Sequence, residues 1–191
     1  MKPCVFLDRD DTLIRNSTLS PPADPHPAWR PGDLSDPGRV ELLPGALDAC
    51  LLLRDAGFVL VIVTNQGSVA RGSATIADVL ATNARVGELL TDDAGVALID
   101  RFYFCPYHPL GNVPEFTRED ELRKPGPGML LLAANELGLD LSRSWLIGDM
   151  PRDCESGINA GLLPERCILI GESAACADVL AAAGDIASGP R

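Results

Sequence analysis

Four short clusters of polar residues carry the chemistry that this sequence can support. In chain order they are Asp8, Asp10 and Asp11; Thr64, Asn65 and Gln66; Arg123 and Lys124; and Asp149 and Asp153. Carboxylates such as those of Asp8 and Asp149 can share one Mg²⁺, which binds oxygen ligands and often a substrate phosphate as well. The hydroxyl of Thr64 and the ammonium of Lys124 can orient and neutralise a phosphoryl group. These residue types therefore predict chemistry on a phosphate ester, provided that the fold brings them together.

The spacing within the first cluster indicates how that chemistry would proceed. An aspartate beside Mg²⁺ can act as a nucleophile and form an aspartyl-phosphate. Asp10 follows Asp8 by two residues, so its carboxyl group can lie close to the first and protonate the leaving group, then activate water. The chain has only two lysines, Lys2 and Lys124, and one of them lies in a cluster that needs a cation. The sequence favours ester hydrolysis with a covalent intermediate.

Alternating apolar patterns predict the elements that would position these clusters. Short, largely β-branched or apolar runs predict buried strands at residues 5–7, 58–63, 99–104, 145–147 and 167–170. Apolar residues at helical spacing predict helices at residues 46–53, 76–90, 129–137, 153–160 and 176–183. The alternation predicts an α/β fold with a Rossmann-like, doubly wound parallel sheet covered by helices on both faces. Ligands bind such sheets at the carboxyl ends of the strands, where the polar clusters fall.

Length and proline content predict one domain over residues 1–191 with two long loops. Residues 17–44 hold seven prolines and read as an irregular loop insertion, too short to be a second folded domain. A second loop over residues 105–123 precedes the Arg123-Lys124 cluster. Long loops in compact domains are usually functional or mobile, so both are candidates to cover the site.

Composition excludes several classes of protein. A formal net charge of −11 makes the chain a poor general binder of nucleic acid, because phosphate contacts need lysine and arginine. The six cysteines form no C-x-x-C pair and mostly lie in apolar runs, as expected for reduced thiols in a cytoplasmic protein. No apolar run has the length of a signal peptide or a membrane span. We expect a cytoplasmic monomer that acts on a small soluble phosphate ester, without membrane or nucleic-acid partners.

The four clusters resemble the four sequence motifs of the haloacid dehalogenase (HAD) superfamily, in the same order. The resemblance rests on Asp8-Arg9-Asp10-Asp11-Thr12, Thr64-Asn65-Gln66, Arg123-Lys124-Pro125, and Gly148-Asp149 with Asp153. The flanking residues resemble more narrowly the family of histidinol-phosphatases and heptose-1,7-bisphosphate 7-phosphatases. The matching segments are Phe6-Leu7-Asp8-Arg9-Asp10, Val63-Thr64-Asn65-Gln66 with Ala70-Arg71-Gly72, Cys105-Pro106-Tyr107-His108-Pro109, and Arg123 to Met129. The resemblance covers the chain except for residues 17–40.

The resemblance implies a role for each of these residues. Asp8 would be the nucleophile and Asp10 the general acid and base. Mg²⁺ would be held by the Asp8 carboxylate, the Asp10 backbone carbonyl and Asp149, with support from Asp153. The remaining expected roles are phosphoryl binding by Thr64 and Lys124 and substrate recognition by Asn65, Gln66, Arg71 and Arg123. The family mostly lacks a large cap domain, so loops would cover the site.

The chain departs from the family pattern in two places. Asp11 stands where the family usually has glycine; we expect the turn to survive, because aspartate tolerates left-handed backbone better than most residues. Many family members hold a structural zinc with a C-x-H pair and a C-x-C pair. Here the corresponding positions are Cys105, Tyr107, Asp120 and Leu122, so three of the four ligands are missing. We therefore expect a zinc-ligand-lacking member whose loop at residues 105–123 is a remnant of the zinc loop.

The substrate stays open at this level. A heptose bisphosphate is the first choice, and histidinol phosphate is the alternative within the family. A polynucleotide 3′-phosphatase carries a similar motif set, but the acidic charge argues against it. A non-catalytic HAD-like regulatory protein is a further alternative, raised by Asp11. Receiver domains also combine acids, Mg²⁺, threonine and lysine, but they place the accepting aspartate after the third strand, where this chain has Phe104-Cys105.

Overall fold

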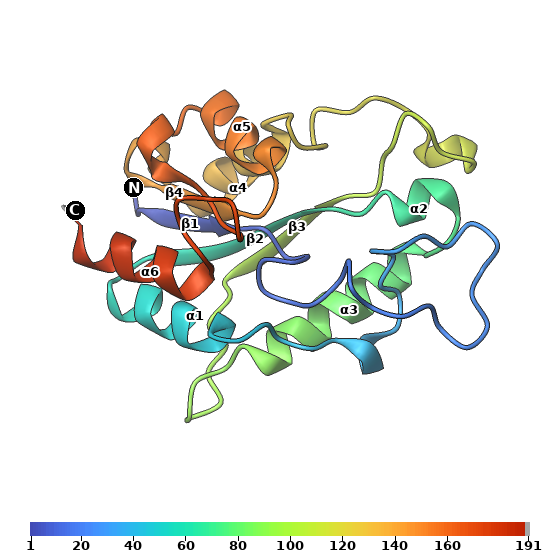
Figure 1. Ribbon diagram of the computed structural model, residues 1–191. Helices are drawn as coiled ribbons and strands as arrows, with labels where there is room; N and C mark the ends of the chain where they lie inside the picture. The colour runs from blue at the N-terminus through green and yellow to red at the C-terminus, as the bar shows by residue number, and fades with distance from the viewer. Residues whose placement is uncertain (190–191) are drawn as a thin grey trace.

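The computed structural model describes residues 1–189 and contains a single parallel sheet flanked by helices (Figure 1). The strand order is β3-β2-β1-β4-β5, and every neighbouring pair is parallel. The strands are β1 (Cys4–Leu7), β2 (Val59–Asn65), β3 (Arg101–Cys105), β4 (Trp145–Gly148) and β5 (Cys167–Leu169). This is the doubly wound α/β architecture that the sequence predicts, and β1 lies at its centre.

Two layers of helices cover the two faces of the sheet. One layer holds α1 (Ala46–Asp55), α3 (Ile76–Leu89) and α6 (Val179–Ser188), and the other holds α4 (Gly128–Leu137) and α5 (Pro151–Ala160). Successive side chains of a strand point to opposite faces. Leu7 accordingly packs in the core under α1, α3 and α6, whereas Phe6 packs in the core under α4 and α5. Each such buried side chain contributes about 1.5–3 kcal/mol, so the central strand is held firmly from both sides.

The strand register brings the polar clusters to one edge. Leu7 lies opposite Ile62 of β2 and opposite Ile147 of β4. The next residue along β1 is Asp8, whose backbone N–H donates to the Ile147 carbonyl at 2.9 Å. Because all strands are parallel, their carboxyl ends meet at this edge.

Element boundaries differ from the sequence prediction in two informative places. The short helix α2 (Ser68–Arg71) was not predicted, because four residues are too few to show a helical period. The last helix begins at Val179 instead of residue 176, because Asp178 caps it by accepting a hydrogen bond from the Ala181 N–H at 2.9 Å. Cys176 instead pairs with Ile170 in an isolated parallel bridge.

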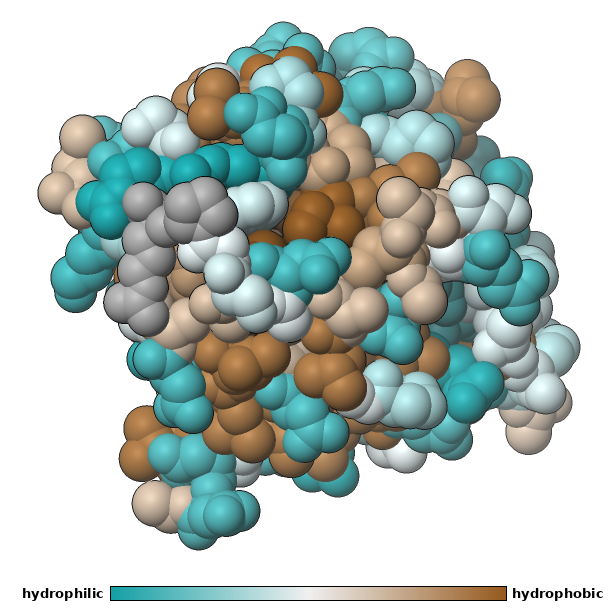
Figure 2. Space-filling view, turned by 60° about the vertical axis from the view of Figure 1, so that its left-hand side comes forward, coloured by the Kyte–Doolittle hydropathy of each residue, from teal (hydrophilic) through white to brown (hydrophobic). Residues whose placement is uncertain are grey.

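The two long irregular segments are present where the proline pattern predicts them. The first contains only a short 3-10 turn, Pro37–Arg39, and the second contains Pro114–Phe116. On the face turned toward the viewer in Figure 2, brown areas lie among teal ones. Exposed apolar residues such as Leu52 and Leu180 are ordinary for a protein surface. Within residues 1–189, no helix combines the length and the apolar character needed to cross a membrane.

Candidate active site

A pocket of about 410 Å³ opens at the carboxyl edge of the sheet. Its floor comes from the ends of β1, β2 and β4, and one wall comes from the proline-rich loop. The residues that line it are Asp8, Asp10, Asp11, Asn16, Ser17, Pro31, Gly32, Asp33, Thr64, Asn65, Arg71, Lys124, Asp149, Met150 and Arg152. Seven of the residues singled out from the sequence for catalysis or binding (Asp8, Asp10, Thr64, Asn65, Arg71, Lys124 and Asp149) therefore face one cavity.

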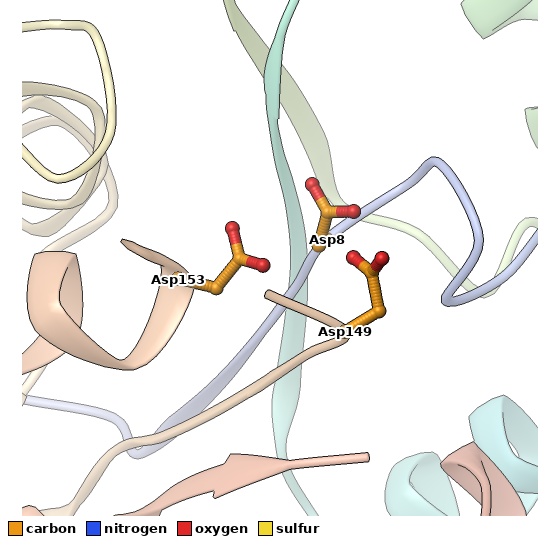
Figure 3. A group of neighbouring side chains, drawn as sticks. All are labelled: Asp8, Asp149 and Asp153. Atoms are coloured by element: carbon orange, nitrogen blue, oxygen red, sulfur yellow. The ribbon is translucent and has the colours of Figure 1, made fainter. Parts of the chain in front are cut away.

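Three carboxylates converge at the floor of this pocket (Figure 3). Asp8 follows β1, Asp149 follows β4, and Asp153 lies in the first turn of α5. Each can offer one oxygen, and the three oxygens lie within 4.8 Å of one another. Asp153 is fixed in place by the Met150 N–H, which donates to its Oδ2 at 2.9 Å. Three oxygen donors this close together match the ligand set of a hard divalent cation.

Lys124 supplies the positive charge at the same point. Its Nζ lies 2.5 Å from an oxygen of Asp8 and 2.6 Å from one of Asp153, and it also donates to the Val63 carbonyl at 2.9 Å. The lysine side chain is almost completely buried. Asn65 holds the lysine backbone on both sides: its amide donates to the Lys124 carbonyl and accepts from the Lys124 N–H, each at 3.0 Å. In this structure Asn65 therefore positions the lysine, although it was singled out for substrate recognition.

Burial and the closeness of the carboxylates to one another disfavour the ionised forms of Asp8 and Asp149. Burial raises the pKa of Asp8 to about 7; Asp153 and Asp10 add to the rise, whereas Lys124 opposes it. Burial, Asp153 and Asp11 raise the pKa of Asp149 to about 6. Burial lowers the pKa of Lys124, but attraction to Asp8 and Asp153 outweighs it, and the net shift is upward. Three carboxylates face one ammonium, so a divalent cation would relieve their repulsion, and the residues fit Mg²⁺.

Asp10 faces the pocket beside this cluster, and several donors hold its carboxylate. Gln66 Nε2 donates to its Oδ2 at 2.7 Å, and the Thr64 hydroxyl donates to the same oxygen at 3.2 Å. Arg9 binds both oxygens from behind, at 3.0–3.1 Å. Gln66, which was singled out for substrate recognition, is thus engaged with Asp10 and Thr64.

Asp11 adopts the left-handed backbone that its position requires. Its φ is +57°, and it is the non-glycine residue with positive φ in the described part of the chain. The turn survives the loss of glycine, as predicted, because the aspartate side chain makes local hydrogen bonds: it accepts from the backbone N–H groups of Asn16 and Ser17 at 3.0 Å. These bonds turn the carboxylate toward the start of the proline-rich loop.

A rim of cationic side chains borders the pocket. Arg71, at the end of α2, pairs with the buried Asp33 of the proline-rich loop. Arg123 donates to the Tyr107 carbonyl at 3.3 Å. A Cβ atom added at Gly67 would lie 3.1 Å from Arg71 and 3.6 Å from Arg123, so both guanidinium groups approach the same spot. Burial lowers the pKa of Arg123, and Arg152 and Arg71 lower it further, as expected where cations gather.

The loop that would carry zinc in the resembling family is organised by other contacts. Cys105 Sγ donates to the Tyr107 carbonyl at 3.7 Å, and Asp120 accepts from the Leu122 N–H at 3.0 Å. The guanidinium of Arg118 lies 3.5 Å above the centre of the Tyr107 ring. Over residues 1–189, groups of three or more potential metal ligands occur at the acid triad and not in this loop.

Sequence reasoning missed two residues that hold this site together. Arg9 lies between two of the predicted catalytic acids, and its fully buried side chain gives no signal in a pattern that treats arginine as a surface residue. Asp33 lies in an irregular loop, where no periodicity marks a buried acid. Both are recognisable only from the contacts that their side chains make.

Comparisons with known proteins agree with this geometry. The family described as HAD-hydrolase-like matches residues 121–183. The D-glycero-beta-D-manno-heptose-1,7-bisphosphate 7-phosphatase of Yersinia pestis is 38% identical over 160 residues, which cover 84% of this chain and 77% of that protein. The protein of the same name from Escherichia coli K12 is 34% identical over 166 residues, covering 84% and 75%.

Solved structures show the same relationship. The crystal structure of a protein described as a HAD-like phosphatase, from Mesorhizobium loti, has a TM-score of 0.80 and 34% identity, covering 97% of this chain and 84% of that one. The D,D-heptose 1,7-bisphosphate phosphatase of B. bronchiseptica, solved with magnesium and phosphate, shares the fold with a TM-score of 0.74 at 24% identity, covering 96% and 97%. The chain therefore belongs to the haloacid dehalogenase superfamily, within the family of the D-glycero-beta-D-manno-heptose-1,7-bisphosphate 7-phosphatases.

Proposed function

We propose that this protein is a Mg²⁺-dependent phosphomonoesterase that works through an aspartyl-phosphate on Asp8. The observation that carries the proposal is the convergence of Asp8, Asp149 and Asp153 on one point, with the ammonium of Lys124 against two of them. Relatives at 34–38% identity are named as phosphatases, which supports the same reaction class.

The residues fit one Mg²⁺ between the first and fourth strands. Asp8 and Asp149 would bind the ion through carboxylate oxygens, the Asp10 backbone carbonyl would complete the protein ligands, and Asp153 would support them. A bound Mg²⁺ would supply charge neutralisation for the phosphoryl oxygens and the attacking carboxylate. The raised pKa values of Asp8 and Asp149 mean that their ionised forms are disfavoured by burial and by neighbouring carboxylates; a bound cation would favour the ionised forms.

The protein side chains then divide the two half-reactions among them. An oxygen of Asp8 attacks phosphorus and displaces the substrate oxygen, which takes a proton from Asp10. Thr64 and Lys124 hold the transferring group through its equatorial oxygens. Asp10, now a carboxylate, takes a proton from water, and the water oxygen attacks the same phosphorus, which releases inorganic phosphate and restores Asp8.

The substrate that we propose is a heptose 1,7-bisphosphate, as named for the relatives. The cationic rim supports a doubly phosphorylated substrate, because Arg71 and Arg123 approach one spot outside the acid cluster. Arginine suits bidentate binding of phosphate, so a second phosphate would have a partner there. Histidinol phosphate carries one phosphate and would leave these guanidinium groups unused.

Three further properties belong to the same proposal. The protein would need no zinc, since Cys105 is the one zinc-type ligand kept at the four positions concerned. It would act as a monomer in the cytoplasm. It would not act on polynucleotides, because a chain with a net charge of −11 attracts the phosphate backbone poorly.

Phosphate release measured over three substrates tests the proposal. We expect turnover of heptose 1,7-bisphosphate with Mg²⁺, loss of turnover in EDTA and recovery when Mg²⁺ is restored. Histidinol phosphate and a 3′-phosphorylated oligonucleotide should be poorer substrates. Asp8→Asn should fold normally and release no phosphate; turnover by this variant would disprove the role of Asp8, and a preference for the oligonucleotide would disprove the substrate class.

A further inference from the structure

Arg9 is a buried cation whose side chain serves a neighbouring acid. Its side chain is 1% exposed, and Arg9 does not line the pocket. Nε and Nη2 donate to Asp10 at 3.0–3.1 Å, and both carboxylate oxygens receive a bond. A charge buried this deeply needs partners, and Asp10 is the carboxylate that the structure gives it.

A second residue fixes the other side of the guanidinium. Asn83, in the middle of α3, accepts a hydrogen bond from Arg9 Nη1 at 2.8 Å through its Oδ1. Asn83 is also buried, so this bond is shielded from water. The chain of contacts thus runs from α3 on one face of the sheet, through Arg9, to the carboxylate of Asp10.

The geometry points to Arg9 and Asn83 as positioning residues that fix the orientation of the Asp10 carboxyl group for proton transfer. The inference rests on the proposed function, in which Asp10 is the general acid and base. Buried ion pairs contribute little net stability compared with apolar packing, but here the pair would fix the orientation of the Asp10 carboxyl group. Arg9 binds Asp10 from behind, and the carboxylate keeps its partly exposed side toward the pocket. Neither Arg9 nor Asn83 would touch substrate or metal.

The step that depends most on this orientation is hydrolysis of the aspartyl-phosphate. There, Asp10 takes a proton from water while the water oxygen bonds to phosphorus and the bond from phosphorus to the Asp8 oxygen breaks. A misdirected Asp10 slows this step but leaves the attack of Asp8 on an ester with a good leaving group intact. The phosphorylated form of the enzyme should then accumulate.

Asn83→Asp, Arg9→Lys and Thr82→Val form a matched set for the test. The new carboxylate in Asn83→Asp competes for the guanidinium, and Arg9→Lys keeps the charge but loses the two-point contact. Thr82 lies next to Asn83 on the same helix and is fully buried, and its hydroxyl has no hydrogen-bond partner among residues 1–189, so Thr82→Val controls for disturbance of α3. Asn83→Asp leaves the cationic rim and the proposed metal ligands unchanged.

We would measure steady-state turnover of p-nitrophenyl phosphate with Mg²⁺, and the phosphorylated fraction by intact mass of acid-quenched protein. We expect kcat to fall about tenfold in Asn83→Asp and at least tenfold in Arg9→Lys, with KM within twofold and a larger phosphorylated fraction. Thr82→Val should match the wild type in all three quantities. If the wild type turns over but Asn83→Asp behaves as Thr82→Val does, the positioning role is wrong. A fall in kcat without accumulation would show a merely structural role, and a wild type without Mg²⁺-dependent turnover would instead overturn the proposed function.

Discussion

The floor of the pocket and its rim are built in different ways. At the floor, Asp8 and Asp149 extend directly from strands, and Lys124 is buried against Asp8. At the rim, Arg71 ends a short helix and is held by Asp33 of the proline-rich loop, whereas Arg123 lies in a loop and is held by the Tyr107 carbonyl of that same loop. The register of the strands fixes the positions of the floor residues as firmly as the core is packed. The positions of the rim residues depend instead on single side-chain contacts. In the proposed function, reaction and recognition therefore rest on separate structural supports.

The strongest test of this contrast is Asp149→Asn at the floor. The amide keeps the shape but removes one negative ligand, so we expect turnover to fall roughly 10³-fold at fixed Mg²⁺. Because the substitution also relieves repulsion from Asp153 and Asp11, the metal-free variant should be at least as stable as the wild type. Phosphate release and urea unfolding give the two readouts. A large stability loss without loss of turnover would reverse the assignment of this residue to the chemistry.

The contact between Asp33 and Arg71, which we call the rim latch, should matter more for stability and substrate binding than for the chemical step. Asp33 is buried and accepts hydrogen bonds from Arg71 and, at 2.6 Å, from the Ser73 hydroxyl. Removing it in Asp33→Ala leaves a guanidinium without its carboxylate, so we expect a loss of about 3 kcal/mol in the free energy of unfolding. We expect kcat/KM for the bisphosphate to fall about tenfold, mainly through KM.

A matched control lies in the same loop system. Glu41 pairs with Arg15 at 3.2 Å, but both side chains are exposed. Glu41→Ala should therefore change the free energy of unfolding by less than about 0.5 kcal/mol and leave KM unchanged. Equal effects of Asp33→Ala and Glu41→Ala would show that the rim latch contributes no more than an exposed ion pair does.

The pH dependence of stability sharpens the description of the floor. The pKa of Asp8 in the folded protein is about 7 and that of Asp149 about 6, both above the ordinary value of 3.8 that an unfolded chain has. Between pH 4 and 7 the folded state therefore binds more protons, and the free energy of unfolding of metal-free protein should decrease as pH rises, by on the order of 5 kcal/mol. Saturating Mg²⁺ should remove most of this decrease, measured by urea titration at several pH values. A metal-free protein that becomes more stable over this range would contradict the crowded-acid interpretation.

The smallest effect is expected in the second loop. Tyr107 stacks under Arg118 near the surface; Arg123 is the residue of this loop placed at the rim, and residues 105–122 do not line the pocket. Tyr107→Ala should cost about 1 kcal/mol of stability and change kcat/KM less than twofold, while Tyr107→Phe should change neither. A tenfold loss of kcat/KM in Tyr107→Ala would show that the Tyr107 side chain contributes to the binding site.

Much of this protein could be read from local patterns in the chain. The apolar runs before Asp8 and Asp149 predict parallel strands whose polar ends share an edge, and the structure has them there. The position of Lys124 in a lysine-poor sequence also indicated a site. These features are local, because a strand and the residue that follows it are neighbours in sequence. The three-dimensional partners of a side chain are not.

The fold class, the family resemblance and the acids and lysine at the floor could thus be predicted from the chain alone, because burial patterns and strand ends depend on residues that are neighbours in sequence. The contacts of Gln66 with Asp10, of Asn65 with Lys124 and of Asp33 with Arg71 could be recognised only in the folded protein. Those contacts join residues 38 to 59 positions apart. They depend on where loops and helices pack, which no single stretch of sequence specifies.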